Sequence, residues 1–178
     1  MLFLFTNPQK RTNKFFVSIF KNQTFRPIHC LPKKQKTMSK NTASAIWKGD
    51  LKSGNGEATL STTGNSFSYT FASRFENGKG TNPEELIAAA HAACYSMALS
   101  NIIASKGYKP IQVSTSATAT LANPGDGFVI TDIMLTTEGS VEGMDEKTFL
   151  DLAVEAKTGC PVSKTLASVN ITLNAKLI

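Results

Sequence analysis

One long apolar segment, residues 82–106, constrains the fold of this 178-residue chain more than any other feature. It begins with Asn-Pro-Glu-Glu at 82–85, which supplies a capping side chain, a proline for the first helical position and acidic residues for the first turn. The following residues are rich in alanine and apolar on nearly every side, and Gly107 marks the end. A helix that is apolar all round is buried on most sides. We therefore expect this segment to be the central helix of a folded domain.

Shorter segments on either side carry the alternating pattern of β-strands. Strands are expected at 45–48, 57–62, 66–72, 111–121, 128–137 and 169–177, with turns at 63–65 and 123–127 and loops at 75–81 and 139–143. A second helix should begin after Asp145 and end at Gly159, and a short third one should run from Pro161 to Leu166. This order predicts one α+β domain over residues 41–178, with a sheet packed on the central helix.

The basic charge of the chain is confined to its first 40 residues. Nine of the 19 Lys and Arg residues lie there with no Asp or Glu, which leaves ten basic and 13 acidic residues in 41–178. The net charge of +6 therefore does not describe the domain, whose own net charge is −3. A nucleic-acid interface needs a basic stripe, and a membrane span needs an unbroken run of about 18 apolar residues. Neither pattern is present, so we expect no nucleic acid and no membrane as partner.

Residues 1–40 form a basic, acid-poor leader with three interpretations. A secretory signal would need an apolar stretch of about 7–15 residues and a small-residue cleavage site, which the leader lacks. The absence of acidic residues suits an organelle transit peptide, although Ser and Arg are sparse for one. The simplest interpretation is a start codon assigned too early, since globular composition opens at Met38, or a disordered tail. We expect a cytoplasmic protein and leave import into an organelle open.

Two cysteines, Cys94 and Cys160, lie in the predicted domain, and Cys30 lies in the leader. Without a secretory signal the compartment should be reducing, and structural disulfides are rare there. The chain has no Cys-x-x-Cys pair and no Cys/His cluster at zinc spacing, so we expect no metal and no cofactor. The two thiols are therefore either inert packing residues or a redox pair.

Cys94 lies on the central helix with two candidate partners on the same face. At 100° per residue, Glu84, His91 and Cys94 fall within about 80° of one another. About 15 Å of helical rise separates Glu84 from Cys94, so the carboxylate cannot touch the sulfur directly. His91 is either a base for the thiol or a packed side chain bonded to a carbonyl. A cysteine on an apolar helix is itself often an inert packing residue.

Cys160 and Arg74 are the other candidate site residues. Pro161 suits a first helical position, so Cys160 should occupy the N-cap, where helix N–H groups lower the pKa of a thiol. A convenient cap residue without chemistry is the alternative. Arg74 is the only arginine after the leader and precedes the central helix. Its guanidinium suits a joint pairing with Glu84 and a thiolate, or forms only a surface salt bridge.

Two motifs resemble the OsmC (osmotically inducible protein C) family. The first is RFE at 74–76, followed by KGTNPEELI at 79–87 and AAHAACYSMALS at 89–100, and the second is GCPVS at 159–163. The WKGD segment at 47–50 also resembles the first strand of that family, so the resemblance covers roughly residues 43–178. It implies an OsmC-like α+β fold, in which an antiparallel sheet packs on the Ala-rich helix that bears the reactive cysteine. It also implies an intertwined homodimer with active sites at the subunit interface.

By the same resemblance, the chain is a thiol peroxidase in defence against oxidative and osmotic stress. The implied substrates are organic hydroperoxides and, less well, hydrogen peroxide. Cys94 takes the peroxidatic role, Cys160 the resolving role, and Arg74 and Glu84 form the activating pair. Related organic hydroperoxide resistance proteins place their arginine elsewhere, so Arg74 favours the osmotically inducible branch. The implied cycle forms a Cys94 sulfenic acid and then a Cys94–Cys160 disulfide, which a dithiol, in this family a lipoylated protein, reopens.

Two other functions would use the same residues. In a thiol-based redox sensor, the Cys94–Cys160 disulfide would change a partner surface, and peroxide in excess would not be consumed. In a binding module, the apolar surroundings of the Ala-rich helix would hold a hydrophobic ligand, and binding would survive Cys94→Ser. The chain shows no DNA-reading or partner-docking segment, so we rank the enzyme above the sensor.

Overall fold

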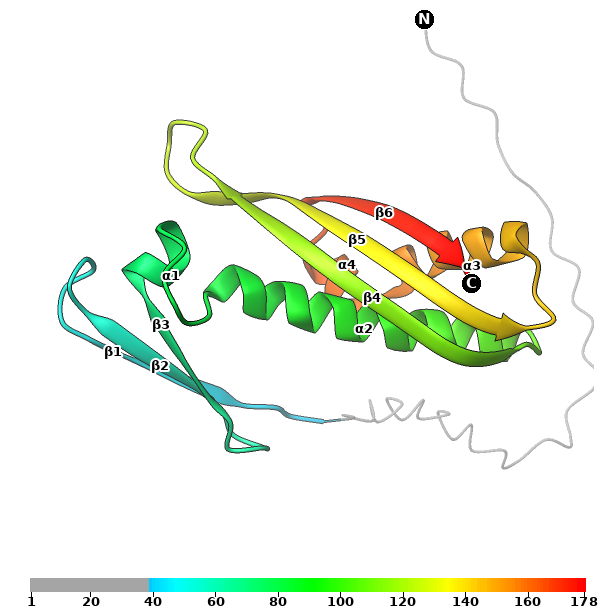
Figure 1. Ribbon diagram of the computed structural model, residues 1–178, viewed down its shortest axis with the longest axis horizontal. Helices are drawn as coiled ribbons and strands as arrows, with labels where there is room; N and C mark the ends of the chain where they lie inside the picture. Colours follow the sequence, from blue (N-terminus) through cyan, green and yellow to red (C-terminus); the bar gives the residue numbers. More distant parts are fainter. Residues whose placement is uncertain (1–38) are drawn as a thin grey trace, which may run out of the picture. The chain divides into compact units, whose positions relative to one another are not determined.

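The computed structural model describes residues 39–178. Almost all of the leader, including Cys30, lies outside the described residues, as do the interpretations attached to it. The described chain forms, in order, β1 (Ala43–Lys48), β2 (Asn55–Leu60), β3 (Ser66–Thr70), α1 (Phe71–Phe75), α2 (Pro83–Ser105), β4 (Lys109–Ala122), β5 (Val129–Glu142), α3 (Glu146–Gly159), α4 (Pro161–Thr165) and β6 (Asn170–Leu177) (Figure 1). This order confirms the α+β class.

The first three strands form an antiparallel sheet with an aromatic pair laid over a glycine. Trp47, Gly56 and Tyr69 lie opposite one another on the three strands. The rings of Trp47 and Tyr69 are 5.5 Å apart between centroids. A Cβ on Gly56 would lie 2.3 Å from Cζ of Tyr69, so only glycine leaves room for this ring. The row of three residues therefore fixes the register of the sheet.

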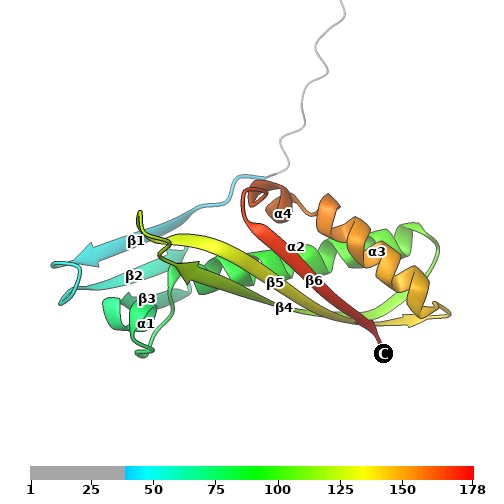
Figure 2. The same cartoon turned by 90° about the horizontal axis from the view of Figure 1, so that it is seen from above.

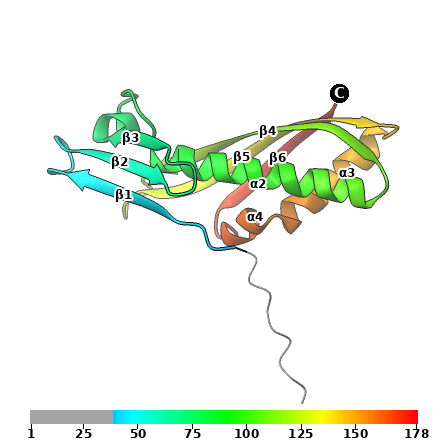
Figure 3. The same ribbon diagram turned by 90° about the horizontal axis from the view of Figure 1, so that it is seen from below.

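The last three strands form a second sheet, with helices on one face. β4 pairs with β5 antiparallel, and β5 pairs with β6 parallel. Figure 2 shows these strands in front of α2, and Figure 3, from the opposite side, shows α2 in front of them. α2 contacts β4, and α3 contacts β6. The parallel pair departs from the antiparallel sheet that the resemblance implied, because α3 and α4 carry the chain back across the sheet before β6.

Gly139 corrects the predicted loop at 139–143. β5 continues through this glycine to Glu142, and Gly139 pairs with Leu177 of β6. The ring of Phe149 from α3 packs directly on Gly139, where a Cβ would lie 2.3 Å from its Cε2 atom. Phe149 is fully buried. Gly139 resembles a loop residue in the sequence, but it lies inside β5, where the missing side chain leaves room for the Phe149 ring of α3.

α1 is the second correction, because a strand through residue 72 and a loop from residue 75 were expected here. Thr70 accepts a hydrogen bond from the Ser73 backbone N–H, and the Thr70 N–H donates to the Ser73 hydroxyl. This reciprocal cap begins a helix that ends at Phe75. Serine is an unusual third residue for such a cap, so the local signal for this helix is weak. The correction matters because α1 carries Arg74.

α2 confirms the predicted central helix at both of its ends. The Asn82 side chain accepts from the Glu85 N–H, and Gly107 follows the helix with a positive φ of 87°. One face is buried, and it carries Glu84, Ala88, His91, Tyr95, Leu99 and Ile103. By length and composition alone α2 also qualifies as a membrane span, but this buried face, packed on β4 and α3, is that of a core helix.

Candidate active site

Cys94 and Cys160 come together in the structure, although 66 residues separate them in the chain. Their sulfur atoms are 3.1 Å apart and share a hydrogen bond. Both thiols are free. Cys160 is fully buried, whereas Cys94 is partly exposed. The arrangement gives one thiol that a solute can reach and a second, shielded thiol beside it.

The residues that follow Cys94 fix the rotation of α2. The buried Tyr95 donates its hydroxyl hydrogen to the Ala153 carbonyl of α3 at 3.0 Å. Ser96 donates to the Thr115 hydroxyl of β4 at 2.8 Å. These two bonds tie α2 to α3 on one side and to the second sheet on the other. The sulfur of Cys94 is therefore held toward α4.

Cys160 lies at the N-cap of α4, with Pro161 as the first helical residue, as the sequence predicts. It is also the C-cap of α3, so two helices meet at this residue. The thiol forms no standard side-chain cap, but the N–H groups of Val162 and Ser163 interact with its sulfur. Helix N-terminal N–H groups favour the charged form of a thiol.

The surroundings shift the pKa values of the two thiols in opposite directions. Burial and, next in size, the hydrogen bond with Cys160 raise the pKa of Cys94; the Val162 N–H lowers it by less, and the charge of Cys160 has the smallest effect and raises it. Burial also acts to raise the pKa of Cys160. Interactions with the Ser163 N–H, the Cys94 thiol, the Ser163 hydroxyl and the Val162 N–H outweigh burial and lower it. Within the described chain, the surroundings therefore favour the thiolate form of Cys160 over that of Cys94.

Arg74 and Glu84 form the predicted ion pair. Arg74 Nη2 lies 2.6 Å from Glu84 Oε1, and Nε lies 3.2 Å from Oε2, so the guanidinium binds the carboxylate through two hydrogen bonds. The Glu84 side chain is 10% exposed and that of Arg74 is 35% exposed. The Arg74 guanidinium also lies 5.2 Å from the centroid of the Phe75 ring, which in turn contacts Phe128. The pair is thus held in one orientation.

The structure does not bring this ion pair to Cys94 within one chain. Glu84 lies in the first turn of α2, about 15 Å of helical rise before Cys94. None of the influences on the pKa of Cys94 comes from a positively charged side chain of the described residues. Of the two interpretations of Arg74, the described residues show the salt bridge to Glu84 and no pairing with the Cys94 sulfur.

His91 binds a residue that the sequence did not single out. Its Nε2 lies 2.8 Å from the hydroxyl oxygen of Ser163 in α4, and both side chains are buried. The contact is neither of the two expected, a base for Cys94 or a bond to a carbonyl. Ser163 belongs to the GCPVS motif, and its helical position is the signal that could have identified it. It lies three residues after the N-cap, where side chains turn back toward the cap.

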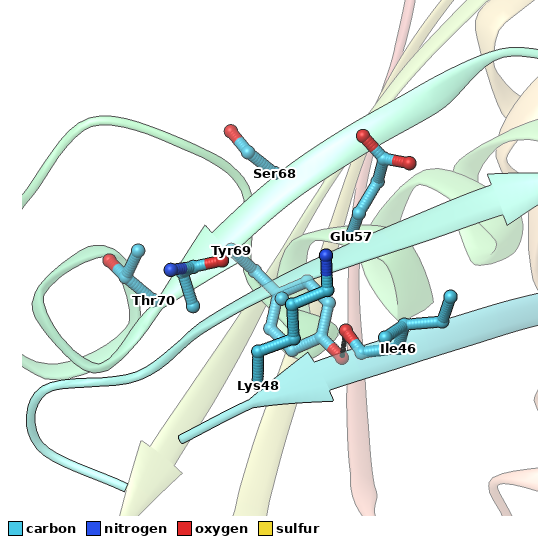
Figure 4. A pocket seen from close by; sticks show the side chains of 8 residues that line it. Ile46, Lys48, Glu57, Ser68, Tyr69 and Thr70 are labelled. Carbon is cyan, nitrogen blue, oxygen red and sulfur yellow. Dashed lines mark hydrogen bonds between the residues drawn. The ribbon is translucent and has the colours of Figure 1, made fainter. Parts of the chain in front are cut away.

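Two surface hollows lie away from the thiol pair. The first, of about 360 Å³, is on the β1–β3 sheet and is shown in Figure 4, where the Tyr69 hydroxyl donates to the Ile46 carbonyl at 3.3 Å. The second, of about 500 Å³, lies between α2 and the start of β4 and includes Met97 and Ile111. Neither is lined by a cysteine. Among residues 39–178, no group of three or more His, Cys, Asp or Glu side chains is placed to hold a metal ion.

Known proteins resemble this chain in sequence and in fold. The family model described as "OsmC-like protein" matches residues 76–174. The peroxiredoxin OsmC of Escherichia coli is 48% identical over 134 residues, covering 75% of this chain and 93% of that protein. An organic hydroperoxide resistance protein of Xanthomonas axonopodis pv. citri is 34% identical over 98 residues, covering 54% of this chain and 67% of that protein.

A solved structure has the same fold at low sequence identity. The OsmC-like protein of Mycoplasma pneumoniae superposes with a TM-score of 0.63 at 20% identity, covering 79% of this chain and 99% of that one. At this identity the likeness concerns the fold alone. Together with the family match and the relative at 48% identity, it places the chain: it belongs to the OsmC family.

Proposed function

We propose that the protein is a two-cysteine, thiol-dependent peroxidase that reduces organic hydroperoxides and, less well, hydrogen peroxide, in defence against oxidative and osmotic stress. The observation that carries the proposal is the pair of free thiols 3.1 Å apart, one partly exposed and one buried. A peroxide can reach only the first, and the second is placed to close a disulfide. The names of two relatives, a peroxiredoxin and an organic hydroperoxide resistance protein, support this class of substrate.

The cycle has three steps. The Cys94 thiolate attacks one oxygen of the hydroperoxide, the O–O bond breaks, and the leaving alkoxide takes a proton to become the alcohol, which leaves a Cys94 sulfenic acid. Cys160 then attacks this sulfur, forming the disulfide and releasing water. A dithiol, of the lipoyl type by family resemblance, reduces the disulfide and returns both thiols. The reducing environment required for this last step makes the cytoplasm part of the proposal.

Cys94 needs a cation that its own protomer does not place beside it. Its pKa is raised within one protomer, whereas the first step requires its thiolate. Arg74 is held in a fixed orientation by Glu84, which itself lies about 15 Å of helical rise before Cys94. We infer that the protein is a homodimer in which the partner's Arg74 lies beside Cys94. A guanidinium at this position would favour the thiolate of Cys94.

The surface of α2 supports a second copy as the occupant of its uncovered face. Opposite the buried face runs a stripe of exposed residues that carries no charge: Ala90, Ala93, Met97, Asn101 and Ala104. Met97 is 74% exposed, and the neighbouring Ile111 is 68% exposed. Small side chains allow another helix to approach closely, and an apolar helix that one chain covers on a single face leaves the other face for a partner.

Peroxide turnover tests the proposed reaction. We would measure consumption of cumene hydroperoxide, tert-butyl hydroperoxide and hydrogen peroxide with dithiothreitol as reductant, using wild type, Cys94→Ser and Cys160→Ser. We expect wild type to turn over many equivalents, Cys94→Ser to be inactive, and Cys160→Ser to be progressively inactivated by over-oxidation. A folded wild type with two free thiols that consumes no more than one equivalent of any peroxide would refute the enzyme and favour the redox sensor.

Subunit mixing tests whether the site is shared between protomers. Differently tagged Cys94→Ser and Glu84→Gln chains are co-expressed, and the heterodimer is purified through both tags. If Glu84 and Arg74 act on the partner's Cys94, one of the two sites in the heterodimer is complete and about half of the wild-type activity returns. If they act within their own chain, both sites are defective and the heterodimer stays inactive. That second result would overturn the shared site while leaving the peroxidase intact.

A further inference from the structure

The His91–Ser163 pair is a buried polar contact that the proposed cycle does not use. His91 is fully buried on α2 and Ser163 is 6% exposed on α4, with 2.8 Å between Nε2 and the hydroxyl oxygen. The other ring nitrogen, Nδ1, is buried without a hydrogen-bond partner. Ser163 in turn interacts with the Cys160 sulfur through both its N–H and its hydroxyl. The three residues therefore form a chain that ends on a reacting sulfur.

The unpaired Nδ1 atom of His91 indicates the direction of the hydrogen bonds in this chain of residues. If Nδ1 carried the ring hydrogen, a buried N–H donor would have no acceptor, and such orphan donors are rarer than under-used acceptors. The hydrogen therefore belongs on Nε2, which donates to the Ser163 oxygen. Burial lowers the pKa of His91, which keeps the ring neutral and this arrangement intact. The Ser163 hydroxyl hydrogen is then free to point at the Cys160 sulfur.

We propose that His91 and Ser163 are positioning residues for Cys160, and that they stabilise its thiolate in the two steps in which this sulfur carries negative charge. This inference rests on the proposed peroxidase cycle. His91 acts only through Ser163, by orienting the hydroxyl, and needs no change in its own protonation. Two other titratable groups, Cys94 and Tyr95, interact with the Cys160 sulfur, and neither supplies a positive charge.

The first of these steps is disulfide formation. The Cys160 thiolate attacks the sulfur of the Cys94 sulfenic acid, so that an S–S bond forms and the S–O bond breaks. The departing hydroxide takes up the proton that Cys160 released and leaves as water. The Cys160 sulfur is oxidised and the Cys94 sulfur is reduced, with no further reactant. A stabilised thiolate raises the fraction of Cys160 that is ready to attack.

The second step is reopening of the disulfide. An external thiolate attacks Cys94, because Cys94 is partly exposed in the reduced protein and Cys160 is fully buried. The S–S bond breaks, a mixed disulfide forms on Cys94, and the electron pair leaves with Cys160. A leaving thiolate with a lower pKa departs faster, so the same Ser163 hydroxyl accelerates reduction.

A thiolate titration tests the pair without any peroxide. In a Cys94→Ser background, the Cys160 pKa is measured by ultraviolet absorbance of the thiolate and by the pH dependence of its alkylation. Ser163→Ala should raise this pKa by about one unit, since a hydrogen bond to a charged group is lost. His91→Leu should raise it too, whereas His91→Gln keeps a donor near the Nε2 position and should preserve it. Thr165→Val is the matched control, because its hydroxyl binds the Pro161 carbonyl of the same helix at 3.0 Å.

The outcome of the titration is independent of peroxidase activity. An unchanged Cys160 pKa in Ser163→Ala would overturn the proposal even if the enzyme turns over peroxide. Equal pKa shifts in His91→Gln and His91→Leu would also overturn it, since they would show that a hydrogen-bond donor at this position does not matter. Far-UV circular dichroism confirms folding, and Ser163→Ala alone decides the question if a His91 variant does not fold.

The two half-reactions separate positioning from general damage. With both cysteines present, Ser163→Ala should slow reduction of the chemically preformed disulfide by dithiothreitol about threefold. It should not slow the single-turnover attack of Cys94 on peroxide, since a less acidic Cys160 competes less with Cys94 for the negative charge. Equal slowing of both half-reactions would show a structural defect and refute the assigned role.

Discussion

Replacing Gly139 by alanine tests how α3 is seated on the second sheet. The new Cβ would lie 2.3 Å from Cε2 and 2.6 Å from Cζ of Phe149, well inside van der Waals contact. Phe149 is fully buried, so its ring cannot move out into solvent. Overpacking a filled core costs about 1–3 kcal/mol, and we expect about 2 kcal/mol here. α3 ends directly before Cys160, so the contact between Phe149 and Gly139 also helps to position the resolving thiol.

The assay is urea unfolding followed by circular dichroism at one fixed protein concentration. Gly159→Ala is the matched control: its Cβ would lie 4.0 Å from the nearest atom, Cδ1 of Ile102, and helical alanine is favoured over glycine by about 0.5–1 kcal/mol. In Phe149→Leu the ring is gone, so adding Gly139→Ala should cost much less than in the parent. A coupling energy of about 1 kcal/mol or more is expected. Additive losses, or a Gly139→Ala variant as stable as the parent, would refute the contact.

Three further predictions concern the site and its surroundings. Arg74→Lys removes one of the two hydrogen bonds to Glu84 and should lower kcat/KM by about tenfold or more. Turnover equal to wild type would show that the two-hydrogen-bond pairing of Arg74 with Glu84 is not needed. Burial lowers the pKa of His91, so the unfolded chain binds a proton at a higher pH than the folded chain does. The free energy of unfolding should therefore fall as pH drops through about 6.5. His91→Gln should reduce that slope in pH-dependent unfolding, and an unchanged slope would count against it. Met97→Glu should shift the protein from dimer to monomer in analytical ultracentrifugation and abolish turnover; an intact, active dimer would exclude this face of α2 as the interface.

Local signals in the sequence predicted most of the elements. Asn82 and Asp145 begin α2 and α3 where their capping side chains indicate, and Gly107 follows α2 with the expected positive φ. These features are set within a few residues of one another, so they can be read without knowledge of the fold. The same holds for Cys160 at the N-cap before Pro161.

Two elements were misjudged because their cause lies outside the local segment or has a weak signal. Gly139 resembles a loop residue, but the ring of Phe149 and the pairing with β6 make it part of a strand. The short helix α1 depends on a reciprocal bond between Thr70 and Ser73, and serine rarely takes that role. The parallel pairing of β6 likewise follows from the path of the chain over the sheet.

The sequence by itself determined the residue types of the site and the elements that carry them: Cys94 on an apolar helix, Cys160 before a proline, and Arg74 with Glu84 at the start of that helix. Only the tertiary structure placed the two sulfurs 3.1 Å apart, joined His91 to Ser163, and paired Arg74 with Glu84. The physical reason is one of range. Caps and helical periodicity act over one to three turns, whereas each of these contacts depends on how α2 packs against α4 and on what covers its remaining face.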